Sequence, residues 1–284
     1  MEVVAVGVLV VAVSGLVVVG LQHYWETSAR LRCTNNLKLV GDGIQTYHQQ
    51  NDNYPPSHIA PGYASWAVVL VPMLPTTERE LLNKWDLSKP YVQQPKQPRQ
   101  AVLSIYFCPT RKRPSLVSVE GDGENAKQTH VPGGLGDYGV CMGDGSLEKL
   151  WATDSANGAI IPAKVLERKD DRILKWKSRT AQNDLVRGQS NTLLVGEKHL
   201  VHEETCKAST GDGSLYNGDN PSSYARVAGS SHELAASRLD PFRNNFGSYH
   251  GNQVCLFLKA DGSIHPFTPS VSPLLLAQLA KRGK

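Results

Sequence analysis

MEVVAVGVLVVAVSGLVVVGL, residues 1–21, is unlike any other part of this 284-residue chain. After the carboxylate of Glu2, residues 3–21 are apolar except for Ser14. A helix rises about 1.5 Å per residue, so this run reaches across the roughly 30 Å hydrocarbon core of a bilayer. We therefore expect residues 1–24 to form the membrane-spanning half of an N-terminal helix.

Three kinds of segment compete for this run. A cleaved secretory signal needs a basic start and a small-x-small cleavage site, whereas this run starts with Glu2 and is followed by LQHYW at 21–25. A signal anchor fits the aromatic residues 24 and 25, which suit a membrane interface. The basic residues at 30, 32 and 38 would then place the domain in the cytoplasm by the positive-inside rule alone. The third kind is a pilin-type helix, which has a carboxylate near its start and continues into a soluble domain.

The helical pattern continues beyond the apolar run. Between residues 26 and 48 the apolar side chains recur mostly at steps of three and four, which is typical of an amphipathic helix with one buried face. No proline occurs before Pro55, and the turn-forming stretch NDNYPP at 51–56 is expected to end the helix. We therefore predict one helix of about fifty residues, whose second half, residues 25–53, packs on an extracytoplasmic globular domain of residues 54–284.

The remainder reads as short elements in long loops, typical of a polar chain rich in Gly and Pro. We expect a strand or short helix at 65–71 and a short helix at 77–85 with Thr77 as its N-cap. Strands are expected at 103–108, 159–161, 191–197 and 253–258, and a C-terminal helix at 270–279. Asp261–Gly262 between apolar strands predicts a hairpin with a second strand at 263–267. The expected fold is α+β, a long helix packed on an antiparallel sheet with large loop insertions.

Charge and cysteine content limit the function only slightly. A net charge of +4 is small for this length and supports no nucleic-acid partner. The short basic run at 111–113 lies between two prolines and predicts a solvated turn. The five cysteines form no CxxC pair, and an extracytoplasmic domain allows one or two disulfides among them, with the pairing open. Of the five, Cys255 is expected to be a buried strand residue.

Known catalytic and metal-binding patterns are missing from the sequence. HExxH and GxSxG do not occur. His250, His265 and Asp261 could be imagined as metal ligands but match no known motif. His199 and His202 have i, i+3 spacing, but they follow a stretch that reads as a strand. We therefore expect no catalytic residue, no metal and no cofactor. A structural calcium ion is an alternative for the Asp- and Asn-rich loops at 212–214 and 217–220, although turn formation explains these loops better.

A set of short motifs, in a shared order, carries a family resemblance. The stretches are 32–38 (RCTNNLK), 47–48 (YH), 54–56 (YPP), 65–75 (SW to LP), 107–110 (FCPT), 137–139 (DYG), 157–158 (NG), 189–197 (QSNTLLVGE), 248–251 (SYHG) and 260–263 (ADGS). Together they resemble the DUF1559 family of planctomycete proteins, which have a pilin- or type II pseudopilin-like N-terminus, and the resemblance covers nearly the whole chain. The matching motif residues are Cys33, Asn35, Asn36, Lys38, Cys108, Pro109, Ser190, Asn191, Thr192, Gly196, Glu197, His250, Asp261 and Gly262.

The chain departs from the family pattern in three places. The usual prepilin leader and its Gly-Phe-Thr-Leu-type cleavage junction are missing, and the chain is expected to begin about three residues inside the mature family helix. Ten residues, not nine, separate His250 from Asp261 in the H-x9-DG-like element. Arg187 stands where Asp is common.

The resemblance implies a role for Glu2. Counted back from Cys33, it matches the glutamate of pilin-like helices that pairs with the N-terminal amine of a neighbouring subunit. A carboxylate in hydrocarbon is costly unless it is paired. The alternative is that Glu2 lies at the aqueous interface, where the helix dipole alone favours a carboxylate.

The function expected from the resemblance is structural. It is that of a pilin- or pseudopilin-like subunit, anchored in the cytoplasmic membrane with a periplasmic or cell-surface domain. Its partners would be membrane lipid and homologous subunits that pack through the N-terminal helix in a filament or secretion pseudopilus. The alternative is a membrane-anchored extracytoplasmic domain that binds a ligand or serves at the surface.

Overall fold

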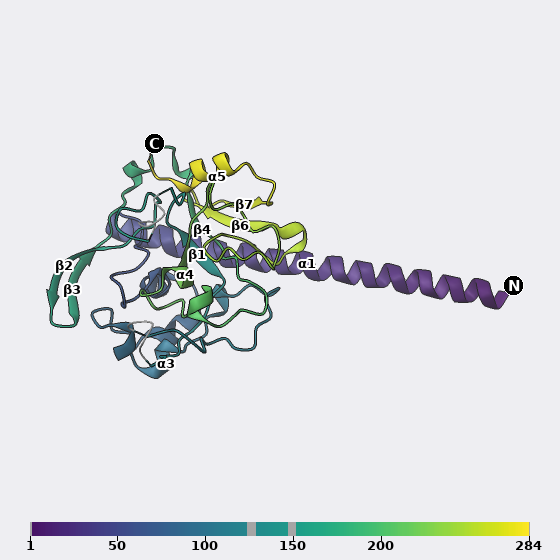
Figure 1. Ribbon diagram of the computed structural model, residues 1–284, viewed down its shortest axis with the longest axis horizontal. Coiled ribbons are helices and arrows are strands. Elements are labelled where there is room, and N and C mark those ends of the chain that lie inside the picture. Colours follow the sequence, from purple (N-terminus) through teal and green to yellow (C-terminus); the bar gives the residue numbers. More distant parts are fainter. Residues whose placement is uncertain (1, 124–128, 147–151, 284) are drawn as a thin grey trace.

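The computed structural model describes residues 2–123, 129–146 and 152–283 (Figure 1). Of the side chains before Val17, it describes only that of Ser14. The chain forms one long helix and a globular body, which packs around the C-terminal half of that helix (Figure 1). The N-terminal half extends away from the body.

Helix α1 (Glu2–Asn51) is continuous, as the sequence predicts. Its second half is amphipathic because one row of side chains at helical spacing is buried. That row consists of Ala29, Cys33, Leu37, Val40, Ile44 and Tyr47. The helix ends where Asp52 adopts a left-handed conformation (φ 54°) and donates its N–H to the carbonyl of His48.

A five-stranded sheet lies beside α1. Its strand order is β5 (Ala225–Arg226), β1 (Tyr138–Cys141), β4 (Leu193–Glu197), β6 (Cys255–Lys259) and β7 (Ile264–Phe267). All neighbours pair antiparallel except β1 and β5, which are parallel, so the sheet is mixed rather than purely antiparallel.

Strand β6 separates two hydrophobic cores. Successive side chains of a strand point to opposite faces. Leu256 and Leu258 therefore join the core beneath α1, while Cys255 and Phe257 join the core beneath helix α5 (Pro273–Ala280). The two helices thus cover opposite faces of the sheet.

A glycine lets α1 approach the sheet closely. A Cβ atom at Gly41 would lie 2.9 Å from Cδ1 of Leu258, which is closer than carbon atoms pack. Glycine is a poor helix former, but because it has no side chain the helix backbone can lie directly on β6 (Figure 1).

The other elements are short. They are α2 (Trp66–Val69), α3 (Lys96–Arg99), α4 (Pro221–Tyr224), a two-stranded sheet of β2 (Lys164–Lys169) and β3 (Arg172–Lys177), and 3-10 turns at Val71–Met73, Thr77–Leu82, Tyr91–Gln93, Ser104–Tyr106, Gln182–Asp184, Gln189–Asn191, Ala208–Thr210 and Gly251–Gln253. The β2–β3 hairpin protrudes from the body at the end opposite the projecting helix (Figure 1).

The expected strands are confirmed only in part. Strands β4, β6 and β7, the hairpin turn and the C-terminal helix form as predicted. The stretch 103–108 is instead a 3-10 turn, and 159–161 is buried but irregular, because apolar content alone does not separate a strand from a buried loop. The short helix at 77–85 is a 3-10 turn capped by Thr76, not by Thr77.

The predicted membrane span stays a prediction. No helix, among the residues that the structure describes, contains an apolar stretch long enough to cross a membrane. Most side chains of the run 3–21 lie outside those residues.

Truncating a buried residue of α1 should destabilise the fold. Leu37 is fully buried, so Leu37→Ala should lower the free energy of unfolding by about 2–5 kcal/mol. Leu31 lies on the same helix and is 60% exposed, so Leu31→Ala should cost less than about 0.5 kcal/mol. Denaturant unfolding of both variants in mild detergent measures the difference, and equal losses would contradict the packing described here.

The buried histidine His58 should make the fold acid-sensitive. Its Nδ1 lies 2.9 Å from the Tyr224 hydroxyl, and burial lowers the pKa of His58 from 6.5 to about 4. Between pH 6.5 and 4 the unfolded chain binds a proton at His58 and the folded chain does not. The free energy of unfolding is therefore unaffected by His58 above pH 6.5 and falls as the pH drops toward 4. The loss is on the order of 3 kcal/mol.

Unfolding at pH 7 and pH 4.5 measures this loss in the wild type and in His58→Gln. The pH dependence should be shallower in His58→Gln than in the wild type and in the control His202→Gln, whose side chain is exposed. An unchanged pH dependence in His58→Gln would show that His58 is not the titrating group.

Candidate functional site

Four of the motif residues meet in one buried cluster. Cys33 comes from α1, Cys108 from the loop after the 3-10 turn at Ser104–Tyr106, Glu197 from the end of β4, and His250 from the loop before β6. One donor atom from each lies within 4.8 Å of all the others. Their exposed fractions are 0–2%, so the cluster is closed to bulk water.

The contacts within the cluster are short. The Cys33 thiol donates to the Cys108 sulfur at 3.2 Å, and the Cys108 sulfur lies 3.7 Å from Nε2 of His250. Nε2 of His250 also lies 3.2 Å from Oε1 of Glu197. All five cysteines of the chain are free and buried in this structure. Cys255 is the buried strand residue that its sequence predicts.

Hydrogen bonds between side chains and backbone N–H groups position three of these residues. The Cys108 N–H donates to Oδ2 of Asp137 at 2.6 Å, and Oε2 of Glu197 accepts the N–H of Leu256 at 2.9 Å. The His250 N–H donates to the hydroxyl of Ser248 at 2.9 Å. These bonds fix the backbone at Cys108 and His250 and the carboxylate of Glu197.

Glu26 connects α1 to the His250 loop. Its Oε1 lies 3.3 Å from Nδ1 of His250 and accepts the N–H of Gly251 at 2.8 Å. Arg30 donates to the same oxygen at 3.0 Å and to the carbonyl of Gly251 at 2.7 Å. Burial opposes ionisation, but the Gly251 hydrogen bond and the charge of His250 lower the pKa of Glu26.

The contacts within the cluster shift the pKa values of its members in opposite directions. The hydrogen bond from Cys33 lowers the pKa of Cys108 to about 6, and it raises the pKa of Cys33 itself. Burial alone would lower the pKa of His250, but its contacts with Cys108 and Glu197 raise it to about 10. Both shifts favour a negative charge on Cys108 and a positive charge on His250.

Buried ion pairs lie directly behind the cluster. Asp137 pairs with Arg111 (3.3 Å) and with Arg113, and Arg113 also pairs with Asp212 at 3.2 Å. The basic run at 111–113 is therefore not a solvated turn, because Arg111 and Arg113 are needed to neutralise these carboxylates. Asp212, considered as a calcium ligand, already accepts from Arg113 and from the N–H of Cys206.

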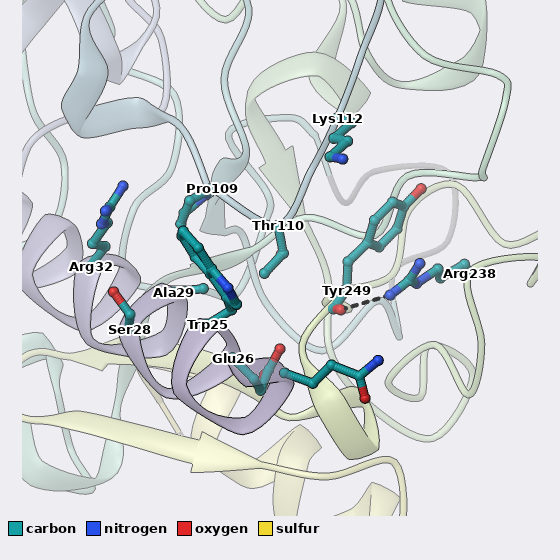
Figure 2. Close-up of a pocket in the computed structure, with 11 residues that line it drawn as sticks. Trp25, Glu26, Ser28, Ala29, Arg32, Pro109, Thr110, Lys112, Arg238 and Tyr249 are labelled. Atoms are coloured by element: carbon teal, nitrogen blue, oxygen red, sulfur yellow. Dashed lines mark hydrogen bonds between the residues drawn. The ribbon is translucent and has the colours of Figure 1, made fainter. Parts of the chain in front are cut away.

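A cavity of about 780 Å³ opens where α1 leaves the body (Figure 2). Trp25 and Glu26 of the helix face Tyr249 across it, and Arg238 donates to the Tyr249 carbonyl at 3.1 Å. The other residues that line it are Gln22, Ser28, Ala29, Arg32, Pro109, Thr110 and Lys112. Because Glu26 and Thr110 also contact His250 and Cys108, the cavity adjoins the cluster.

The remaining motif residues have structural roles or lie at the surface. Asn36 donates to the carbonyl of Phe107 at 3.0 Å, which ties α1 to the Cys108 loop, whereas Asn35 and Lys38 are exposed. Pro109 lines the cavity. The side chain of Glu2 lies outside the described residues, so its pairing stays a prediction.

The second half of the motif set mainly shapes the turn into β4 and the β6–β7 hairpin. Ser190 is exposed, while Asn191 and Thr192 donate to the carbonyls of Arg187 and Gly188. At Gly196, a Cβ atom would lie 2.7 Å from the Phe257 ring, so the strand needs a glycine.

Asp261 and Gly262 form the hairpin turn, where Asp261 accepts from the N–H of Ser263 at 2.9 Å. The sequence alone does not distinguish the motif residues that shape turns from those that form the cluster, whereas the structure does. Glu26 was missed because it lies in no recognisable pattern. Asp137 lies in the DYG stretch and Arg111 in the basic run at 111–113, but neither pattern indicated an ion pair beside the cluster.

The comparisons with known proteins identify the family. A family model described as a protein of unknown function (DUF1559) matches residues 22–274. The chain belongs to the DUF1559 family. No curated protein and no solved structure matches this DUF1559 chain.

Removing the charge of Asp137 should destabilise this DUF1559 protein strongly. Asp137→Asn leaves the buried Arg111 without its counter-ion and Arg113 with Asp212 alone, which should cost about 3–5 kcal/mol of unfolding free energy. Asp154 forms an exposed pair with Arg179 at 3.3 Å, so Asp154→Asn should cost only about 0–1 kcal/mol. Thermal and denaturant unfolding compare the two, and a mild effect of Asp137→Asn would mean that water reaches the ion pairs.

Proposed function

We propose that this DUF1559 protein is a structural, pilin- or pseudopilin-like subunit. In this proposal α1 anchors it in the cytoplasmic membrane and packs with the helices of homologous subunits, with the globular body outside the cytoplasm. The observation that carries the proposal is the continuity of α1, which runs unbroken from the apolar N-terminal half into the core of the body (Figure 1).

The part of the projecting helix whose side chains the structure describes, from Val17 to Leu21, is apolar and exposed. Val17, Val18, Val19 and Leu21 are each 52–63% exposed. Contiguous exposed apolar surface is unfavourable in water and marks contact with a membrane or another protein. Tyr24 and Trp25, which follow, are 67% and 65% exposed and suit a lipid headgroup region.

The helix leaves the body in a fixed direction. Glu26 and Arg30 bond to Gly251, and Asn36 bonds to the Cys108 loop, so the first turns beyond the apolar run are held to two separate loops. A rigid exit angle supports a subunit role. Many copies can pack through this helix in a regular array only if each globular body has the same orientation relative to its helix.

The cavity beside the helix favours the alternative function. Arg32, Lys112 and Arg238 bring positive charge to its wall, and Trp25 and Tyr249 add aromatic surface. This combination suits an anionic ligand of a membrane-anchored binding domain. We propose no catalytic role, since Glu197 lies closer to Nε2 of His250 than the Cys108 sulfur does and competes for the nitrogen that a catalytic thiolate would need.

A charge in the projecting helix should disrupt membrane anchoring. Val17→Asp introduces a carboxylate into the apolar run, where it costs about 2.5–3.5 kcal/mol in hydrocarbon. Less protein should then resist alkaline extraction from membranes, and fewer homologous subunits should co-purify. Val186→Asp is the matched control, because Val186 is 57% exposed but lies on the body.

Imaging of a labelled copy separates the two functions. Filaments or puncta that contain homologous subunits support the subunit role, and Glu2→Ala should reduce them. A smooth label over the envelope, without co-purifying homologues, would refute the subunit role. If Val17→Asp still released the protein from membranes, the anchored binding domain would be the remaining function. Equal extraction of Val17→Asp and Val186→Asp would refute anchoring by α1.

A further inference from the structure

We propose that Cys33, Cys108, Glu197 and His250 bind one zinc ion, which fastens α1 to the globular body. The sequence predicts no metal site, because the four residues come from four separate stretches without metal-ligand spacing. The inference goes beyond the subunit function and does not depend on it.

The donor types and their spacing fit zinc. Two cysteine sulfurs, one imidazole nitrogen and one carboxylate oxygen are ligands that Zn²⁺ accepts in tetrahedral sites. With metal–ligand distances of about 2.0–2.3 Å, neighbouring ligands in a tetrahedron lie about 3.3–3.8 Å apart. The 3.7 Å from the Cys108 sulfur to Nε2 of His250 lies within that range, and the 3.2 Å from Nε2 to Oε1 of Glu197 lies just below it. The two sulfurs, at 3.2 Å, would have to separate by about 0.5 Å to bind one zinc ion.

An unpaired buried oxygen points to a cation. Oε1 of Glu197 is fully buried and has no hydrogen-bond donor, although it lies at ion-pair distance from His250. The positive charge of His250 offsets the negative charge of the carboxylate, but no group donates a hydrogen bond to this oxygen. A cation between Glu197 and the two sulfurs would coordinate the oxygen directly and would use all four side chains.

The surroundings provide an outer shell. In metal sites the second nitrogen of a ligating histidine usually faces a carboxylate, which fixes the ring and its tautomer. Nδ1 of His250 faces Oε1 of Glu26 at 3.3 Å in this way. The hydroxyl of Thr110 lies 3.0 Å from the Cys108 sulfur. The buried cation of Arg111 interacts with Cys108 and Glu197 and offsets the excess negative charge of three anionic ligands.

Two cavities adjoin the cluster. Cys108 lines a second cavity of about 490 Å³ on the side of Asn36 and Arg111. Glu26 and Thr110 line the larger cavity at the helix exit. The cluster thus lies between two hollows, while its own donor atoms are shielded from bulk water.

A disulfide between Cys33 and Cys108 is the competing explanation. It would use both sulfurs but leave Oε1 of Glu197 and Nε2 of His250 buried against an uncharged bond. Zinc accounts for all four residues, and it joins α1 to three other segments at once. Because metal binding adds to the free energy of folding, zinc removal should loosen the attachment of α1.

Metal analysis of the purified full chain tests the proposal. Protein prepared in detergent with zinc in the medium should contain one zinc ion per chain. The zinc content per chain should be at least ten-fold lower in Cys33→Ser and in Cys108→Ser than in the wild type. It should be unchanged in Cys141→Ser. Cys141 is the matched control, since it is equally buried and lies outside the cluster.

Measurements on the unmodified chain avoid the risk that a variant misfolds. Cobalt added to the zinc-depleted chain should give the absorption of a tetrahedral cobalt–thiolate site, and all five thiols should react after denaturation with a chelator. Three reactive thiols and a Cys33–Cys108 cross-linked peptide would overturn the proposal, as would a reduced, folded chain that binds neither metal. A different metal held by the same residues would overturn the assignment to zinc.

Glu26 should act as a positioning residue. Glu26→Gln keeps the four ligands but removes the charge beside Nδ1 of His250, so zinc affinity measured by chelator competition should fall about 10–100-fold. Glu120→Gln, at an exposed carboxylate on the body, should leave affinity unchanged. Unchanged affinity in a normally folded Glu26→Gln would show that Glu26 serves only the helix attachment.

Discussion

Burial of one face of α1 against β6 is the contact on which the rest of the structure depends. The buried side chains from Cys33 to Tyr47 form one wall of the larger core, and Gly41 lets the helix lie directly on Leu258. Most of the other elements are single turns that have too few residues to be stable alone. They are ordered because they pack around this helix and the sheet.

The helix is fixed most firmly at the point where it leaves the body. Within about three turns, Glu26, Arg30, Cys33 and Asn36 contact loops that are separated from them by more than seventy residues in the chain. Such long-range contacts set the direction of the projecting half, and the buried ion pairs of Asp137 support the same junction from behind. The shape proposed for a subunit therefore results from polar contacts at the junction as well as from the hydrophobic core.

Local patterns in the sequence predicted the parts of the fold that they determine. The periodicity of 26–48 predicted the buried face of α1, and Asp261–Gly262 predicted the β6–β7 hairpin. The β2–β3 hairpin was missed because most of its side chains are exposed and charged, so no apolar alternation marks it. The cluster was missed for another reason: the motifs listed Cys33, Cys108, Glu197 and His250 among residues that only shape turns, and only folding shows which of them meet.

Amide hydrogen exchange of the full chain in detergent tests the central claim that α1 is an integral part of the body. Amides between Cys33 and Tyr47 should exchange as slowly as those of β4 and β6, because they open only when the whole body unfolds. Exchange of that half of α1 as fast as in the exposed β2–β3 hairpin would contradict the account, since it would mean that the helix detaches while the body stays folded.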